Sequence, residues 1–190
     1  GQLIADLGYR READGIFRDG AGRNLAMEFN TDPSNDIQVK SLFVIADYWQ
    51  RLGVSVDPVV LPQQQLQDPR WKSDYRAFSL RKQPINLDRL ETNFHSGQIP
   101  TPENNFRGAN YPGYVNPELD TLIGKFFATV PRGERIAVAS QIVHILSDQL
   151  IIVGLFYDVE VVLINGRMTN VTGRGLSAGE SWNAHDWDIE

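Results

Sequence analysis

Two adjacent cations, Arg81 and Lys82, directly follow a segment that is predicted to be a buried strand, Tyr75 to Leu80. Arginine carries N–H donors in a planar fork that matches a carboxylate or a phosphate. In α/β proteins, ligands gather at the carboxyl ends of parallel strands. The position of Arg81 therefore predicts recognition of an anionic group, and a solvated strand end is the alternative interpretation.

A second candidate surface is the loop in the segment RGANYPGYVNPELDTLI, which contains Asn110, Tyr111 and Tyr114. Tyrosine supplies a rigid apolar body with one hydroxyl group, which suits a binding pocket. The loop leads into a helix whose start is well specified, because Asn116 can cap it and Pro117 fits its first position. We expect these side chains either to line a pocket or to pack against one another within the loop.

Residues that could support catalysis form no recognisable motif. The histidines, His95, His144 and His185, lie far apart, and none has a metal-ligand spacing such as HExxH. His144 is expected on a helix surface, and Ser79 with His95 is the only nucleophile–base pair that a hydrolase could use. We predict that the protein is not an enzyme and has no catalytic residues and no cofactor.

The acidic tail gives one weak metal alternative. His185, Asp186 and Asp188 could bind a metal ion, but a frayed tail is the preferred interpretation, and we predict no metal site.

Alternating strand and helix patterns surround these candidates. A strand at LAMEFN, a helix at residues 36–52 and a strand at VSVDPVVLP form a strand–helix–strand unit, which makes a parallel pair. Further patterns predict partial helix at 87–94, helices at 117–127 and 131–150 (Ile136, Ala139, Ile142, Val143 and Leu146 on one face), two strands within 151–165 broken near Tyr157, and a short strand at MTNVTG. The interleaving predicts an α/β domain.

Composition excludes several classes of protein. The 190 residues are enough for one ordinary domain, and a net charge of −6 argues against nucleic acid as a partner. The chain has no cysteine and no apolar run of transmembrane length. The opening GQLIADLGY has the pattern of the last turns of a helix closed by Gly8, so we expect a chain cut from a longer protein.

The segments LIADLGY, ADYWQRLGVSVD, NFHS, YVNPELDTLI, GERIAVASQIVHILSDQ and VGLFYDVEVVLIN occur here in order. Together they resemble the carboxyl-terminal lobe of the family 5 extracellular solute-binding proteins, the peptide- and nickel-type binding components of ABC importers. The resemblance covers almost the whole chain and implies a type II periplasmic-binding-protein-like fold, a mixed sheet flanked by helices. Residues 1–190 would be one lobe, with the amino-terminal lobe absent.

The resemblance also implies a function. The two lobes would close on a small solute and deliver it to the membrane permease subunits of an ABC importer, in the periplasm or outside the cell, with a lipid anchor as one option. The solute-contacting residues would be Ser79, Arg81, Asn86, Asn110 and Tyr111, with Tyr157 behind them. A protein-docking role for the exposed half-cleft and a hydrolase are the alternatives.

One departure from the family bears on the solute. Peptide binders of this family usually carry a Trp and an Asp just after the strand that matches Tyr75 to Leu80, where the Asp neutralises a peptide's amino terminus. Here the matching stretch is FSLRKQPINLD, with Arg81 and Lys82 near that position and Asp88 further along. A free amino group beside Arg81 would be repelled. We therefore expect a solute with a carboxylate, a phosphate or neutral polar groups rather than an ordinary peptide.

Overall fold

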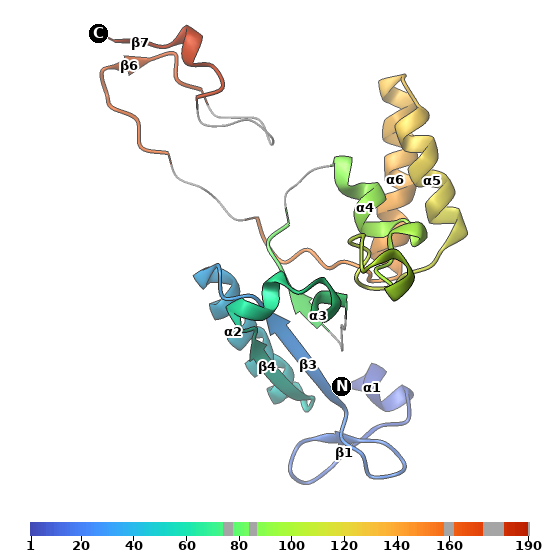
Figure 1. Ribbon diagram of the computed structural model, residues 1–190. Coiled ribbons are helices and arrows are strands. Elements are labelled where there is room, and N and C mark those ends of the chain that lie inside the picture. Colours follow the sequence, from blue (N-terminus) through green and yellow to red (C-terminus); the bar gives the residue numbers. More distant parts are fainter. Residues whose placement is uncertain (74–77, 84–86, 158–161, 173–180, 190) are drawn as a thin grey trace. The chain divides into compact units, whose positions relative to one another are not determined.

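The structure is a computed structural model that describes residues 1–73, 78–83, 87–157, 162–172 and 181–189. The chain divides into two compact units (Figure 1). Unit 1 comprises Gly1–Gln83 and Ser96–Tyr114, and unit 2 comprises Pro84–His95 and Val115–Glu190. Strands and helices interleave, so the predicted α/β class is confirmed. The assignment of residues 1–190 to one lobe stays a prediction.

A three-stranded parallel sheet forms the centre of unit 1. Its strands are β3 (Ala26–Thr31), β4 (Ser55–Val60) and β5 (Phe78–Leu80), in the order β4-β3-β5. The predicted parallel pair around a helix is therefore confirmed. The chain leaves β3 for β4 on one side and returns to β5 on the other side. The boundary between β3 and β5 is thus a topological switch point, the place where α/β sheets bind ligands.

Helix α2 (Asp36–Leu52) covers one face of this sheet. The Asn35 side chain caps its start, and Gly53 ends it in the left-handed conformation, with a φ of 112°. Its inner face buries Leu42 and Ala46 completely or nearly so against Phe29, Val54 and Val56. Trp49 completes the contact, with ring centroids 5.2 Å from Phe29 and 5.4 Å from Phe78.

Short elements make up the rest of unit 1. They are α1 (Gln2–Asp6), β1 (Arg10–Arg11), β2 (Phe17–Arg18), η1 (Gln63–Gln67), α3 (Pro69–Ser73), η3 (Ser96–Gln98) and η4 (Pro102–Asn104).

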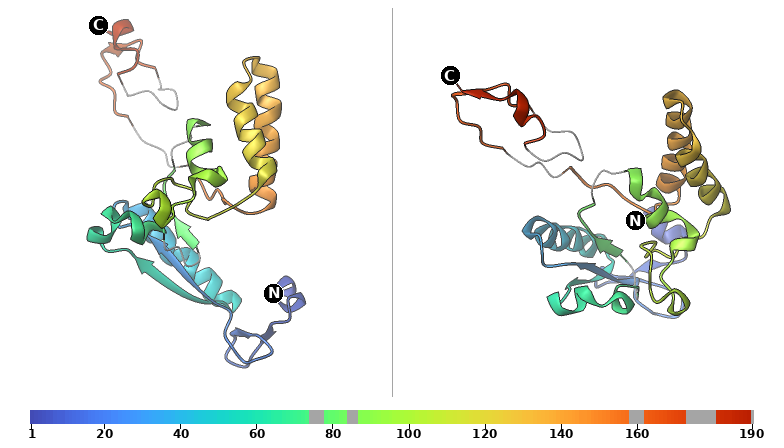
Figure 2. Two further views of the ribbon diagram at one scale, coloured as in Figure 1. Left: turned by 45° about the vertical axis from the view of Figure 1, so that its right-hand side comes forward. Right: turned by 45° about the horizontal axis from the view of Figure 1, so that its top comes forward.

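Unit 2 is built around two longer helices, α5 (Pro117–Ala128) and α6 (Arg132–Asp148), with η2 (Leu87–Arg89) and α4 (Leu90–Phe94). Both views in Figure 2 show α5 and α6 side by side. The predicted apolar face of α6 is partly wrong. Val138, Ile142 and Leu146 are its buried residues, whereas Ile136 and Val143 are more than half exposed. Apolar residues lie on several sides of this helix, so spacing alone did not identify the inner face.

The two strands expected within residues 151–165 are absent from the described parts, 151–157 and 162–165. The side chains of these residues are largely exposed, and Leu163 is 94% exposed. A strand forms only where a neighbouring strand can pair its backbone N–H and C=O groups. The short strand at MTNVTG is confirmed as β6 (Met168–Thr169).

The tail is more ordered than expected. Strand β7 (Asp188–Ile189) pairs with β6. The side chain of Asn183 is buried; its Nδ2 donates a hydrogen bond to the Asn170 carbonyl (2.7 Å), and its Oδ1 accepts one from the Trp187 indole N–H (2.9 Å). The frayed-tail interpretation was therefore wrong. No group of three acidic, histidine or cysteine side chains in the described part of the chain could hold a metal ion.

Candidate binding site

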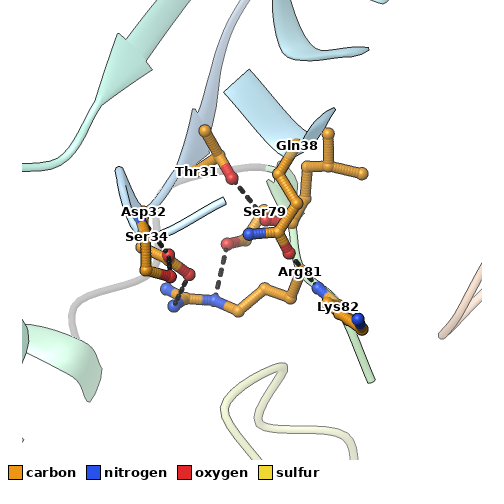
Figure 3. Close-up of polar contacts among 8 residues, drawn as sticks. Thr31, Asp32, Ser34, Gln38, Ser79, Arg81 and Lys82 are labelled. Atoms are coloured by element: carbon orange, nitrogen blue, oxygen red, sulfur yellow. Dashed lines mark hydrogen bonds and ion pairs between the residues drawn. The ribbon is translucent and has the colours of Figure 1, made fainter. Parts of the chain in front are cut away.

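Polar side chains meet at the carboxyl ends of β3 and β5, the switch point of the sheet (Figure 3). Asp32 follows β3 directly, and Arg81 follows β5 directly. Because both strands run in the same direction and Thr31 is in register with Leu80, the residues after them emerge at one edge. The edge therefore combines a carboxylate and a guanidinium that are far apart in the sequence.

Arg81 is held from two sides. Its Nη1 lies 3.5 Å from Asp32 Oδ2, and its Nε donates a hydrogen bond to Ser79 Oγ at 3.1 Å. The side chains of Arg81 and Asp32 are 24% and 16% exposed. Partial burial and these contacts orient the guanidinium. The Arg81 side chain would therefore lose less conformational entropy when a ligand binds.

Asp32 is fixed by the turn that follows β3. It accepts hydrogen bonds from the Ser34 N–H (3.0 Å) and the Ser34 hydroxyl. Burial raises the pKa of the Asp32 carboxyl, but the Ser34 hydrogen bonds and the charge of Arg81 lower it more. The net result is a pKa below the ordinary value, so Asp32 is negatively charged at neutral pH.

Helix α2 ties the same edge to the core. Gln38, which is buried in its first turn, accepts a hydrogen bond from the Lys82 N–H through Oε1. The Thr31 hydroxyl, which is fully buried, donates to the Leu80 carbonyl at 2.8 Å. These contacts fix the backbone on both sides of Arg81, while the Lys82 side chain is exposed. With Arg81, Lys82 and Asp32, the edge carries a net charge of about +1.

The second candidate surface, the loop before α5, is organised around Asn110. This residue is fully buried. Its Nδ2 donates to the Tyr114 carbonyl (2.9 Å), its Oδ1 accepts from the Tyr114 N–H (3.2 Å), and its backbone N–H donates to the Gln98 carbonyl (3.1 Å). Of the two interpretations left open for the loop, internal packing describes Asn110. Its contact with a solute stays a prediction.

Gly108 explains how closely this loop is folded. Its φ is 102°, and a Cβ built on it would lie 2.0 Å from the Gln98 carbonyl oxygen. Only glycine allows this approach of two backbone segments. The loop is therefore preorganised within unit 1, whether or not Tyr111 contacts a ligand.

The other predicted contact residues stand as follows. Ser79 lies beside Arg81, whereas Tyr157 belongs to unit 2 and is 80% exposed. Asn86 lies outside the described residues. Their contact with a solute stays a prediction.

The hydrolase alternative gains no support from these contacts. Ser79 accepts the Arg81 hydrogen bond, and His95 Nδ1 lies 3.9 Å from Asp120 Oδ1 within unit 2. Sequence reasoning missed Asp32. The available signal was its place directly after a predicted strand that is parallel to the strand before Arg81.

Comparisons with known proteins bear on the class of fold. No protein-family model matches the chain, and no curated protein matches it. Solved structures do match. NikZ from Campylobacter jejuni, in complex with Ni(L-His), is 20% identical, with a TM-score of 0.73 over 98% of this chain and 37% of that one. The oligopeptide-binding protein AppA from Bacillus subtilis, in complex with a nonapeptide, is 18% identical, with a TM-score of 0.70 over 100% of this chain and 36% of that one.

A third structure extends the range of bound molecules. The periplasmic oligopeptide-binding protein of an oligopeptide ABC transporter from Thermotoga maritima, bound to mannohexaose, is 16% identical, with a TM-score of 0.67 over 79% of this chain and 28% of that one.

These likenesses define the class of fold. The chain has the fold of part of the periplasmic-binding-protein-like solute-binding proteins, and the resemblance to the family 5 binding proteins is confirmed at the level of the fold. It spans 37% of the length of NikZ and 36% of the length of AppA. Across the part that the structure describes, no helix has the length and apolarity to cross a membrane.

Proposed function

We propose that this chain supplies one lobe of the substrate-binding component of an ABC importer. The fold supports a binding role, because the structural neighbours include the oligopeptide-binding protein AppA and the periplasmic binding protein of an oligopeptide ABC transporter. In this proposal the solute lies against the carboxyl edge of β3 and β5, is enclosed by a second lobe and is then passed to permease subunits. The protein would act in the periplasm or outside the cell.

The observation that carries the proposal is Arg81, held by Asp32 and Ser79 at the switch point of the sheet. A preoriented guanidinium is suited to a planar anionic group such as a carboxylate. Asp32 also supplies a carboxylate at this edge. The proposed solute is therefore a polar compound with a carboxylate or phosphate group, and neutral hydrogen-bonding groups are compatible with Asp32.

The neighbours do not identify the solute. Their bound molecules are a nickel–histidine complex, a nonapeptide and a hexasaccharide, on similar folds. The choice of solute must therefore come from side chains at the site rather than from the fold.

The test is thermal unfolding of the intact protein and of the 190-residue chain with short peptides, acidic sugars, phosphorylated compounds and neutral oligosaccharides. A compound that binds only the native state raises the melting temperature. We expect an acidic compound to do so in the intact protein. Arg81→Ala should then weaken its binding about tenfold or more, since a charge-assisted hydrogen bond contributes roughly 1.5–3 kcal/mol.

Arg70→Ala is the matched control, because Arg70 is an exposed arginine of α3 in the same unit. Equal loss of binding in the two variants would contradict a specific role for Arg81. The absence of any shift with every compound would contradict solute capture and favour the protein-docking alternative.

A further inference from the structure

Helix α2 carries a second apolar row, apart from the face that packs on the sheet. The inner face buries Leu42 and Ala46. The second row has a member on every turn, at spacings of three or four positions, and consists of Ile37, Ser41, Val44, Tyr48 and Leu52. Its four large apolar side chains are exposed, from 40% at Leu52 to 63% at Tyr48. An apolar surface of this length on a soluble protein is typical of an interaction site.

A row of charges runs beside the apolar row. Each charged residue directly precedes one of the apolar row, and the four are Asp36, Lys40, Asp47 and Arg51. All four are exposed, and Asp47 pairs with Arg51 on the same helix at 2.8 Å. Along the helix the signs alternate, beginning with an acid and ending with a base. The reversed order begins with a base and ends with an acid, so this row is complementary to itself in the antiparallel direction.

The apolar row is also complementary to itself. Two helices related by a two-fold axis run antiparallel, bring the same side of each helix together and make every contact twice. With the axis beside Val44, this valine would meet Val44 of a second copy. Tyr48, four positions later, would lie opposite Ser41 of that copy, three positions before the axis, so that a large side chain meets a small one. Ile37 would lie opposite Leu52 at the ends.

The same placement of the axis pairs all the charges. Asp36 would lie opposite Arg51 of the second copy, and Lys40 opposite Asp47. Charges that flank an apolar seam between helices set the choice of partner and the orientation of the pair. The apolar row and the charged row therefore specify the same antiparallel arrangement independently.

We propose that α2 is the surface through which two copies of this chain associate, antiparallel about a two-fold axis at Val44, with the apolar rows in contact and the charged rows paired. With 17 residues, α2 is about 25 Å long. One helix pair lies at or below the low end of standard interfaces, about 1,200 Å², so we expect a weak dimer with a Kd on the order of tens of micromolar. This inference does not depend on solute capture at Arg81.

Sedimentation equilibrium of the 190-residue chain, from about 5 to 500 µM, measures this association. We expect a monomer–dimer equilibrium in the wild type. Val44→Glu should weaken it at least about a hundredfold, because two like charges would be buried at the axis. Phe43→Glu is the matched control: Phe43 is also half exposed on α2 but lies on the other side of the charged row, so this variant should associate as the wild type does. Both substitutions are at exposed positions, and melting temperatures check that both variants fold.

A charge exchange tests the antiparallel arrangement. Lys40→Glu and Asp47→Lys each create two like-charge pairs in the dimer and should weaken it about tenfold. An equimolar mixture of these two variants restores opposite charges in the mixed dimer, so its association should return close to that of the wild type. No recovery in the mixture would overturn the antiparallel arrangement.

A wild type that stays monomeric at the highest concentration, or Val44→Glu that associates as the wild type does, would overturn the role of α2 in self-association. The apolar row would then be covered by a different protein or by another part of this one. Neither result would affect binding at Arg81, which the solute panel measures separately.

Discussion

The two units use different kinds of contact. In unit 1, β3, β4 and β5 are neighbours in space but are separated in sequence by α2 and by the segment after β4. In unit 2, α5 and α6 are consecutive helices, and their buried side chains meet across a short connection. Asp32 and Arg81 come together only where distant segments converge. The difference indicates that unit 1 brings distant polar groups together, whereas the helix pair of unit 2 is held together mainly by local apolar contacts.

The same substitution in the two units should have opposite effects, and this is the largest difference that we expect. A Cβ at Gly53 would lie 2.5 Å from the Gly15 carbonyl oxygen and 2.8 Å from the Phe17 ring, at a φ of 112°. Gly53→Ala should lower the free energy of unfolding by about 2 kcal/mol or more. Gly124 lies within α5 with open space around it, so Gly124→Ala should raise it by roughly 0.5–1 kcal/mol.

Urea unfolding of both variants measures this difference, and hydrogen exchange assigns each change to α2 or to α5. A neutral Gly53→Ala would mean that the end of α2 shifts easily against Gly15 and Phe17. That outcome would weaken the view that unit 1 depends on close contacts between distant segments.

The helix starts should not distinguish the units. Asn35 Oδ1 accepts from N–H groups at 2.9 and 3.1 Å, and Asn116 Oδ1 accepts from its two at 2.9 and 3.1 Å. Asn35→Ala and Asn116→Ala should each cost about 1 kcal/mol, and the Asp variants at both positions should retain most of the stability. Unequal losses in urea unfolding would show that one helix start depends on contacts beyond its cap.

The smallest effect concerns pH and should be confined to unit 1. Because the pKa of Asp32 is lowered in the folded protein, its contribution to stability is present above its unfolded-state pKa, which is near 3.8, and is lost as the pH falls through the folded-state value. Asp32→Asn should remove less than about 1 kcal/mol at neutral pH, the range of ion pairs near a surface. It should also flatten the stability curve at acidic pH.

Asp47→Asn is the control for this measurement. Asp47 pairs with Arg51 on the exposed side of α2 at 2.8 Å, and such pairs contribute little. Melting temperatures between pH 7 and pH 3 compare the two variants. If the melting temperature of Asp32→Asn falls with pH in parallel with that of the wild type, Asp32 does not contribute to the acid sensitivity of unit 1.

The sequence by itself predicted the elements whose signals are local. The cap at Asn116 predicted the start of α5, and the apolar spacing of residues 36–52 with Gly53 after them predicted α2, because each signal acts within a few residues of the backbone. The parallel pair of β3 and β4 followed from the strand–helix–strand pattern. Arg81 was predicted at the carboxyl end of a strand because it directly follows one.

Only the tertiary structure decided which distant residues meet. Strand order placed Asp32 against Arg81, and packing of the loop turned Asn110 inward to bond Tyr114. Which face of α6 is buried, and the absence of a strand in residues 151–157, also depend on packing and pairing partners that no local pattern specifies. Apolar residues at a regular spacing predict that one face of a helix or strand is buried, but they do not predict which element packs against that face. Register and strand order are settled by contacts between distant segments, whose energies a sequence pattern does not contain.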